Sequence, residues 1–421
     1  MEANRIMPEF APVVEIDRLM AELSALAAIS EAEPPVVTRI VFSEADLRAR
    51  AFIKDLCRAA GLSIREDAVG NTFARWEGSE PELPAVATGS HIDAIPNAGA
   101  YDGVVGVLGG LEALRALQRA GFRPRRSIEL VIFTAEEPTR FGIGCLGSRM
   151  MGGVLTSEAA AKLRDREDRS LDELRAQVGF SGDLDSVLLP PGHYSSFVEL
   201  HIEQGPLLER DGINLGIVTH IAAPASLRIS IEGEGGHAGA MLMPDRHDAL
   251  CAASELILAL ETAAKSTGVI DTVATVGVCE VFPGAVNSVP SRVRLETDVR
   301  DTDADRRDGV LAKLKTVAEE VAAKRGVRIE FETVNADPPA ACDPGILETI
   351  EAAANDAGRS SQRMVSRAYH DSLFMARFAP VAMIFIPCRG GVSHRPDEYA
   401  SPEWIAGGVE ALARTLARLA R

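Results

Sequence analysis

The chain has 421 residues, 46% of them hydrophobic and 25% charged, so we expect a globular protein with more than one core. Its 61 acidic residues outnumber its 44 Lys and Arg, and the net charge of −17 argues against nucleic acid or an anionic membrane as the main partner. The first twenty residues lack a cationic region followed by an apolar core, and no long apolar run occurs. We therefore expect a soluble, cytoplasmic protein that acts on a small molecule.

Buried strands and amphipathic helices alternate through the first half of the chain, which predicts an α/β sheet. The apolar run 84–90 is expected to be a strand that ends at His91 and Asp93, and a turn rich in Gly and Asn leads on to Asp102 and a helix from Val104. The other elements expected here are a helix over 16–29, a linker with Pro34 and Pro35, a helix over 45–60 capped by Ser43, a hairpin with a two-residue turn at Gly70-Asn71, a strand over 129–134, a solvated helical insertion over 155–190 and a strand over 197–205.

From Gly216 the pattern changes to a self-contained α+β unit, with two helices expected against an antiparallel sheet. A Pro-rich stretch then leads back to the α/β pattern, which resumes with a helix over 346–358, a strand over 380–388 and a helix from Pro402. We therefore predict an α/β domain with a mixed or parallel sheet and an α+β domain inserted into it. The predicted ranges are 1–214 and 335–421 for the first and 215–334 for the second.

Acid and imidazole side chains fall at the ends of the predicted core strands. In open α/β sheets ligands bind beyond the carboxyl ends of the strands, so we expect these groups to meet at one edge. Two divalent ions about 3.5–4 Å apart suit such a set, because one carboxylate, Asp102, can bridge them. Glu136 would stay free as a general base, and Asp93 would fix an imidazole. The proposed ligands are His91, Asp102, Glu137, His201 and His394.

Each of these residues also has a purely structural interpretation. His91 and His201 suit a buried core, Glu136 and Glu137 suit a solvated loop, and His394 suits a turn. Five such residues at one sheet edge are hard to attribute to chance, so the metal interpretation is favoured. The six cysteines are scattered and form no C-x-x-C pair, which indicates reduced thiols with packing roles.

Several segments carry a resemblance to the amidohydrolases of ureido compounds, within the di-metal aminopeptidase-like superfamily. This group comprises allantoate amidohydrolases, N-carbamoyl-L-amino-acid hydrolases and ureidoglycolate amidohydrolases. Within it, Tyr369 and the stretch GHAGAMLMP look most like the ureidoglycolate enzymes. The segments are GSHIDAIPNAGAYDG, FTAEEPTRFGIGCLGSR, FVELHIEQGPLLER, GGHAGAMLMP, GAVNSVPSRVRLETDVRD and RAYHDSLFMAR with IPCRGGVSHRPDEY.

The resemblance implies one ion on His91, Asp102 and His201, another on Asp102, Glu137 and His394, and Glu136 as general base. It implies Mn²⁺ as the usual metal, although the ligand types also suit Zn²⁺, Co²⁺ or Ni²⁺. The inserted domain would serve as a lid and would form a homodimer.

The remaining implied groups bind substrate. His237 resembles the histidine that reaches the partner's active site and stabilises an oxyanion there. Asn287 and Arg300 match a pair that holds the substrate carboxylate, with a surface salt bridge from Arg300 to Asp298 or Asp301 as the alternative. Gln204 and His370 are further candidates, and a structural hydrogen bond with Asp371 is the alternative for His370.

The implied reaction is hydrolysis of the ureido C–N bond of a small ureido acid. Ureidoglycolate is the expected substrate, which would yield glyoxylate, ammonia and carbon dioxide. The alternatives within the group are N-carbamoyl-L-amino acids and allantoate. A peptidase and a non-catalytic dimeric binding protein are the rival classes, and the second is disfavoured because the ligand set and Glu136 are all present.

Overall fold

A computed structural model describes residues 11–421 and divides them into two compact units. Unit 1 comprises residues 11–219, 341–364 and 370–421, and unit 2 comprises residues 220–340 and 365–369. The first half of the N-terminal stretch considered above for a leader lies outside the described residues. Within the described part of the chain, no helix is both long and apolar enough to cross a bilayer.

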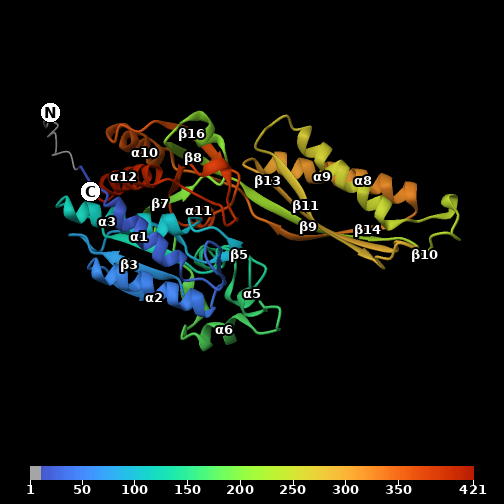
Figure 1. Ribbon diagram of the computed structural model, residues 1–421, viewed down its shortest axis with the longest axis horizontal. Coiled ribbons are helices and arrows are strands. Elements are labelled where there is room, and N and C mark those ends of the chain that lie inside the picture. The colour runs from blue at the N-terminus through green and yellow to red at the C-terminus, as the bar shows by residue number, and fades with distance from the viewer. Residues whose placement is uncertain (1–10) are drawn as a thin grey trace. The chain divides into compact units, whose positions relative to one another are not determined.

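A nine-stranded mixed sheet forms the centre of unit 1 (Figure 1). Its four central strands are parallel, in the order β17, β7, β4 and β6, and its outer strands β8, β3 and β2 run antiparallel to their neighbours. The predicted mixed α/β sheet is therefore confirmed. The strands in spatial order are β15 (Ala340–Ala341), β8 (Leu215–Ile221), β17 (Val381–Ile386), β7 (Tyr194–Ile202), β4 (Ala85–His91), β6 (Ile128–Phe133), β3 (Thr72–Trp76) and β2 (Ser63–Glu66), with β16 (Ser361–Ser366) paired to β8.

Both faces of the central strands are covered, which explains their continuous apolar sequences. On β6, Leu130 lies against Gly110 of helix α3, whereas Val131 and Phe133 belong to a hydrophobic cluster on the opposite face.

Helix α2 begins as predicted, because the Ser43 side chain accepts the Asp46 N–H. A separate two-stranded sheet joins β1 (Val37–Arg39) to β5 (Ala94–Ala98). The helices of this unit are α1 (Ile16–Ala27), α2 (Glu44–Ala59), α3 (Val104–Arg119), α4 (Leu146–Met151), α5 (Ser157–Ala161), α6 (Leu171–Gln177), α7 (Leu207–Asp211), α10 (Pro344–Asp356), α11 (Asp371–Met375) and α12 (Pro402–Leu419), with 3₁₀ turns η1 (Leu184–Val187) and η3 (Arg389–Gly391).

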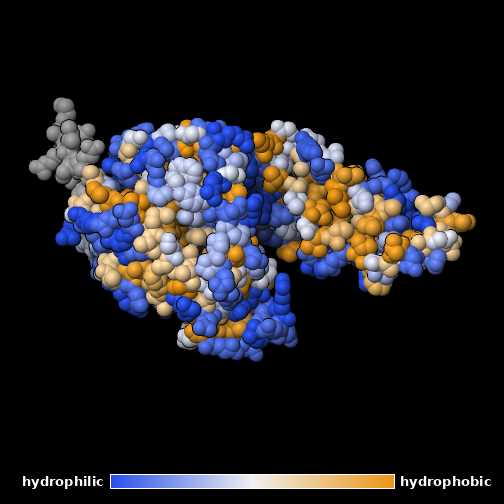
Figure 2. Space-filling model, viewed as in Figure 1, coloured by the Kyte–Doolittle hydropathy of each residue, from blue (hydrophilic) through white to orange (hydrophobic). Residues whose placement is uncertain are grey.

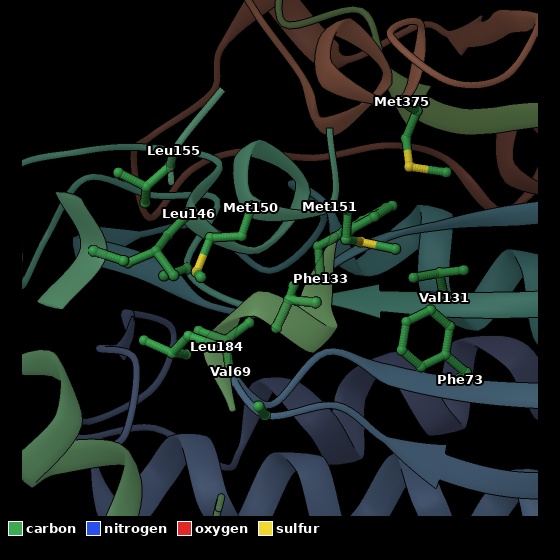
Figure 3. Close-up of a cluster of buried hydrophobic side chains, with 14 of the residues drawn as sticks. Val69, Phe73, Val131, Phe133, Leu146, Met150, Met151, Leu155, Leu184 and Met375 are labelled. Atoms are coloured by element: carbon green, nitrogen blue, oxygen red, sulfur yellow. The ribbon is translucent and has the colours of Figure 1, made fainter. Parts of the chain in front are cut away.

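The prediction of a solvated insertion over 155–190 is wrong. Leu155 and Leu184 lie in the same hydrophobic cluster as Phe133 and Met150 (Figure 3), and Leu171 of α6 is fully buried. The charged residues of this segment face solvent, while its widely spaced apolar residues extend the core. The low density of apolar residues concealed that packing.

The predicted two-residue hairpin turn is also wrong. Strands β2 and β3 do pair, but Glu66 lies opposite Thr72, so the loop holds the five residues 67–71. Asp67 organises this loop, because its carboxylate accepts the backbone N–H groups of Val69 and Asn71. The aspartate side chain thus adds to the backbone hydrogen bonds of the turn, in which the Gly70 N–H donates to the Asp67 carbonyl.

Unit 2 is the expected α+β arrangement. Its four-stranded antiparallel sheet has the order β11, β13, β9, β14, and helices α8 and α9 pack on one face (Figure 1). Residues alternate along β9, where Leu227, Ile229 and Ile231 are buried under the helices. The elements are β9 (Ala223–Glu232), β10 (Gly236–His237), η2 (Met243–Asp245), α8 (Ala249–Lys265), β11 (Val273–Phe282), β12 (Ser288–Val289), β13 (Arg292–Asp301), α9 (Ala304–Arg325) and β14 (Arg328–Ala336).

One strand expected in the inserted unit belongs elsewhere. Strand β8 contains Gly216, where the inserted unit was expected to begin, but it pairs with β17 and β16 in the nine-stranded sheet. Its sequence LGIVTHI is apolar enough for either sheet, so composition alone does not distinguish the two.

Candidate metal centre

The parallel strands of unit 1 deliver the predicted ligands to one edge of the sheet. His91 is the last residue of β4, His201 is the penultimate residue of β7, and Glu136 and Glu137 follow β6 closely. His394 lies in the loop after β17. Because these four strands are adjacent and point the same way, their carboxyl ends bring residues far apart in sequence into one place.

The first group of donors consists of His91, Asp102 and His201. Asp102 Oδ1 lies 3.5 Å from His91 Nε2 and 3.1 Å from His201 Nε2. The other ring nitrogen of each histidine faces a backbone carbonyl, at 3.0 Å from Asp93 for His91 and 2.9 Å from Ile202 for His201. A carbonyl only accepts, so each Nδ1 carries the hydrogen and each Nε2 is left unprotonated, with its lone pair available to a cation on His91 and shared with the Gly103 N–H on His201.

The second group consists of Asp102, Glu137 and His394, and it uses the other oxygen of Asp102. His394 Nε2 lies 3.2 Å from Asp102 Oδ2 and 3.3 Å from Glu137 Oε1. Within each group the donor atoms all lie within 4.8 Å of one another. The two oxygens of one buried carboxylate therefore serve two separate groups of donors, which is the arrangement that a bridging ligand needs.

Glu136 lies beside the first group without belonging to it. Its Oε2 is 3.8 Å from His91 Nε2, and its Oε1 accepts a contact from the Cys145 thiol at 3.4 Å. The Asp93 carboxylate accepts the backbone N–H groups of Glu136 and Glu137, at 3.2 and 3.0 Å. Asp93 thus holds His91 with its carbonyl oxygen and the two glutamates with its carboxylate.

Burial and neighbouring charges shift the pKa values of the side chains in this site. Burial raises the pKa of the Glu137 carboxyl to about 7, and the nearby charge of Asp102 adds to the shift. Burial also raises the pKa of Glu136 well above its usual range. The hydrogen bond with Asp102 raises the pKa of His394 to about 9. The two buried glutamates thus resist ionisation, and divalent cations bound beside them would stabilise their charged carboxylates.

Gly103, which immediately precedes α3, allows the donors to approach so closely. Its φ is +64°, and a Cβ on this residue would lie 2.4 Å from His91 Nε2. A side chain at this position would therefore occupy the space of the first group. The same residue donates its N–H to His201 Nε2 at 3.1 Å.

The structure adds two residues that the sequence did not suggest, Ser393 and Glu398. The Ser393 hydroxyl lies 2.7 Å from Asp102 Oδ2 and 2.9 Å from Glu398 Oε2. The predicted substrate residue Gln204 also reaches Asp102 Oδ2, with its Nε2 at 2.6 Å. Both missed residues flank His394 in the loop after a buried strand, and that position was the available signal.

His370 is buried, and its ring centroid lies 4.6 Å from that of His201. His370 also forms a third group of possible donors with His201 and Glu199. The Asp371 carboxylate accepts the Ser148 hydroxyl at 2.5 Å. His370 therefore borders the first group.

The other predicted substrate residues lie in unit 2. His237 and Asn287 are exposed neighbours, because β10 pairs with β12 and the Ala238 N–H donates to the Asn287 carbonyl at 2.9 Å. Arg300 pairs with Asp298 through two hydrogen bonds of 2.8 and 3.2 Å, so the salt bridge considered as its alternative is present.

Comparison with known proteins gives consistent matches along the chain. Residues 87–418 match the model of a protein family described as "Peptidase family M20/M25/M40". A ureidoglycolate hydrolase of Oryza sativa subsp. japonica is 53% identical over 413 residues, which are 96% of this chain and 85% of the relative. An N-carbamoyl-L-amino acid amidohydrolase of Geobacillus stearothermophilus is 38% identical, over 97% of this chain and 100% of the relative. Crystal structures of AtUAH with glyoxylate and with (S)-hydroxyglycine share 51% identity and a TM-score of 0.89, and cover 97% of this chain and 99% of theirs.

Proposed function

Since the chain belongs to the peptidase family M20/M25/M40, we propose that it is a metal-dependent amidohydrolase that cleaves the ureido C–N bond of ureidoglycolate. The main support for a two-ion centre is that the two Asp102 oxygens lie in two separate groups of donors. The substrate rests on the rice ureidoglycolate hydrolase and on AtUAH, whose complexes contain glyoxylate and (S)-hydroxyglycine.

His91, Asp102 and His201 would hold one divalent ion, and Asp102, Glu137 and His394 the other. Bound there, the ions would lower the pKa of the attacking water and stabilise negative charge on the ureido oxygen. Mn²⁺ is the proposed metal, because a site rich in carboxylates with some imidazoles accommodates it.

Glu136 would transfer the protons of the reaction. Its carboxylate takes a proton from the water that attacks the ureido carbonyl carbon, and then returns that proton to the leaving nitrogen. Cys145 and the backbone hydrogen bonds to Asp93 hold Glu136 beside His91. Cleavage releases ammonia, carbon dioxide and hydroxyglycine, which breaks down to glyoxylate and a second ammonia.

Unit 2 would supply the groups that recognise substrate. Asn287 and Arg300 would hold the carboxylate, and His237 of the partner subunit would stabilise the oxyanion. The proposed domains remain residues 1–214 with 335–421 for catalysis and residues 215–334 as the lid and dimerisation domain. A cytoplasmic location is part of the same proposal.

An exposed apolar surface in unit 2 supports the homodimer. Helices α8 and α9 border a groove of about 590 Å³, and Figure 2 shows hydrophobic residues gathered over these helices. Leu258 in that groove is 62% exposed. Contiguous exposed apolar patches, rather than single apolar side chains, mark surfaces that contact another protein.

A substrate panel tests the proposed function. Purified protein supplied with Mn²⁺ is incubated with ureidoglycolate, allantoate and N-carbamoyl-L-amino acids, and released ammonia is measured. We expect the highest kcat/KM for ureidoglycolate, with two ammonia molecules for each glyoxylate. Turnover of carbamoyl amino acids without any turnover of ureidoglycolate would contradict the proposed substrate. A dipeptide control tests the peptidase alternative.

A further inference from the structure

We infer that Glu398 is a positioning residue that assembles the second group of donors, by clamping the loop with His394 onto the loop with Asp102. This inference rests on the two-ion centre proposed above. Glu398 lies in the loop between β17 and α12 and is only 5% exposed. No cationic side chain of the described residues pairs with its carboxylate, so its function lies in the groups that it accepts.

The two oxygens of Glu398 contact different parts of the site. Oε1 accepts the backbone N–H groups of Tyr101 and Asp102, at 2.7 and 3.1 Å. Oε2 accepts the Ser393 hydroxyl at 2.9 Å, next to His394 in the chain. Glu398 therefore fixes the backbone of the bridging aspartate and the residue preceding a proposed ligand at the same time.

The surroundings of Glu398 leave it little freedom. A Cβ on Gly99 would lie 2.4 Å from the Cβ of Glu398, so the loop approaches it at a residue without a side chain. The next residue, Tyr399, packs edge-on against Tyr101 with ring centroids 5.9 Å apart. Arg389 covers the other part of Tyr399, with its guanidinium carbon 4.7 Å from the ring centroid. The two loops are thus joined by hydrogen bonds and by rings packed edge to face.

Ser393 couples this clamp to the ligand itself. Its hydroxyl has one hydrogen but lies within hydrogen-bond distance of both Asp102 Oδ2 and Glu398 Oε2. When a cation takes the Oδ2 lone pair, the hydroxyl can donate to Glu398 instead. Glu398 therefore offers the Ser393 hydroxyl an alternative acceptor and relieves Asp102 Oδ2 of that hydrogen bond. His394 needs this support, because its φ of +59° is uncommon for a residue with a side chain.

The test is a titration of the protein with Mn²⁺ alone, in which calorimetry measures the affinity for each ion. Metal analysis of the dialysed protein then counts the bound ions. We expect Glu398→Ala to weaken one of the two ions by about 10- to 100-fold and to leave the other nearly unchanged, as is typical when a residue that orients a ligand is lost. Glu398→Gln should recover binding only in part, because its side-chain oxygen still accepts both N–H groups but its amide nitrogen cannot accept the Ser393 hydroxyl.

Glu129→Ala is the matched control. Glu129 is also a buried glutamate of unit 1, but it lies near the start of β6 and accepts the Tyr194 hydroxyl at 2.6 Å. Its loss should lower the melting temperature and leave the affinity for both ions unchanged.

The inference would be overturned if Glu398→Ala bound both ions with wild-type affinity. It would also be overturned if the control variant Glu129→Ala weakened the binding of both ions equally. If Glu398→Ala does not fold, the double variant Ser393→Ala with Glu398→Gln tests the same link and must weaken one ion. Because the titration uses no substrate, failure of the proposed substrate is distinguishable from failure of this inference.

Discussion

Among single residues, Asp102 connects the two groups of donors, so its loss should affect both ions. We predict that Asp102→Ala abolishes binding of two Mn²⁺ ions, whereas His394→Ala, which removes a donor of the second group alone, leaves one ion bound. Metal analysis after dialysis measures the number of ions. One retained ion in Asp102→Ala with unchanged affinity would contradict the bridging role.

Gly103 gives a second prediction at this scale. Gly103→Ala and Gly121→Ala both place a side chain at positive φ, +64° and +74°, but only at Gly103 would the new Cβ meet another atom. Gly121→Ala should lose about 1–2 kcal/mol of unfolding free energy, and Gly103→Ala should lose more, because its Cβ also clashes with His91. Only Gly103→Ala should also weaken metal binding, as measured by Mn²⁺ titration. Equal metal affinities in the two variants would mean that the close approach to His91 is unimportant.

Residue types and their positions at strand ends were enough to predict which side chains meet. His91, Asp102, Glu137, His201 and His394 come together as expected, and Glu136 lies beside them. The sequence did not reveal Glu398 or Ser393, because their role depends on which backbone groups the folded loop turns toward them. For the same reason it did not show that the Asp93 carbonyl oxygen approaches His91 Nδ1 at 3.0 Å, in addition to the Asp93 carboxylate at 3.6 Å.

At the scale of elements, the segment 155–190 packs against the core instead of lying in solvent. Leu171→Ala removes a fully buried side chain and should cost about 2–5 kcal/mol of unfolding free energy. Leu188→Ala, in the same segment at 57% exposure, should cost less than about 0.5 kcal/mol. Denaturant unfolding measures the free energy of unfolding of both variants. A small effect of Leu171→Ala would restore the interpretation of a solvated insertion.

Helices and buried strands were predictable because their periodicity is local. The central strands, the helices and the N-cap at Ser43 agree with the expectation. The loop at Asp67 was not predictable, because its shape depends on a side chain that accepts backbone N–H groups. The placement of β8 was not predictable either, because an apolar strand can pair in either of the two sheets.

At the scale of the whole molecule, the predicted family and the predicted enzyme class, an amidohydrolase, are confirmed by relatives that match almost the entire chain. The α/β unit with a separate α+β unit is confirmed as well. The domain limits stay a prediction. The identity of the metal and the homodimer also stay predictions, because they depend on ligands and on contacts between subunits that local sequence patterns do not encode.

Removal of metal should destabilise the folded protein. Chelation leaves Asp102, Glu136 and Glu137 crowded in a buried site without cations. Mn²⁺ at about 1,000 times its Kd should contribute about 4 kcal/mol to stability. Calorimetry should therefore show a lower melting temperature after chelation and recovery when Mn²⁺ is restored, with no response to Mn²⁺ in Asp102→Ala. Equal melting temperatures of chelated and loaded wild-type protein would contradict a bound metal centre.

Ammonia release from ureidoglycolate by wild type and by Glu136→Gln, each loaded with Mn²⁺ and analysed for bound metal, tests the central claim most directly. The amide in Glu136→Gln cannot accept the proton of the attacking water, so we predict that kcat falls by about 10²–10⁴-fold while two ions remain bound. Wild-type protein that holds two ions without releasing ammonia, or a Glu136→Gln variant with wild-type kcat, would contradict the account.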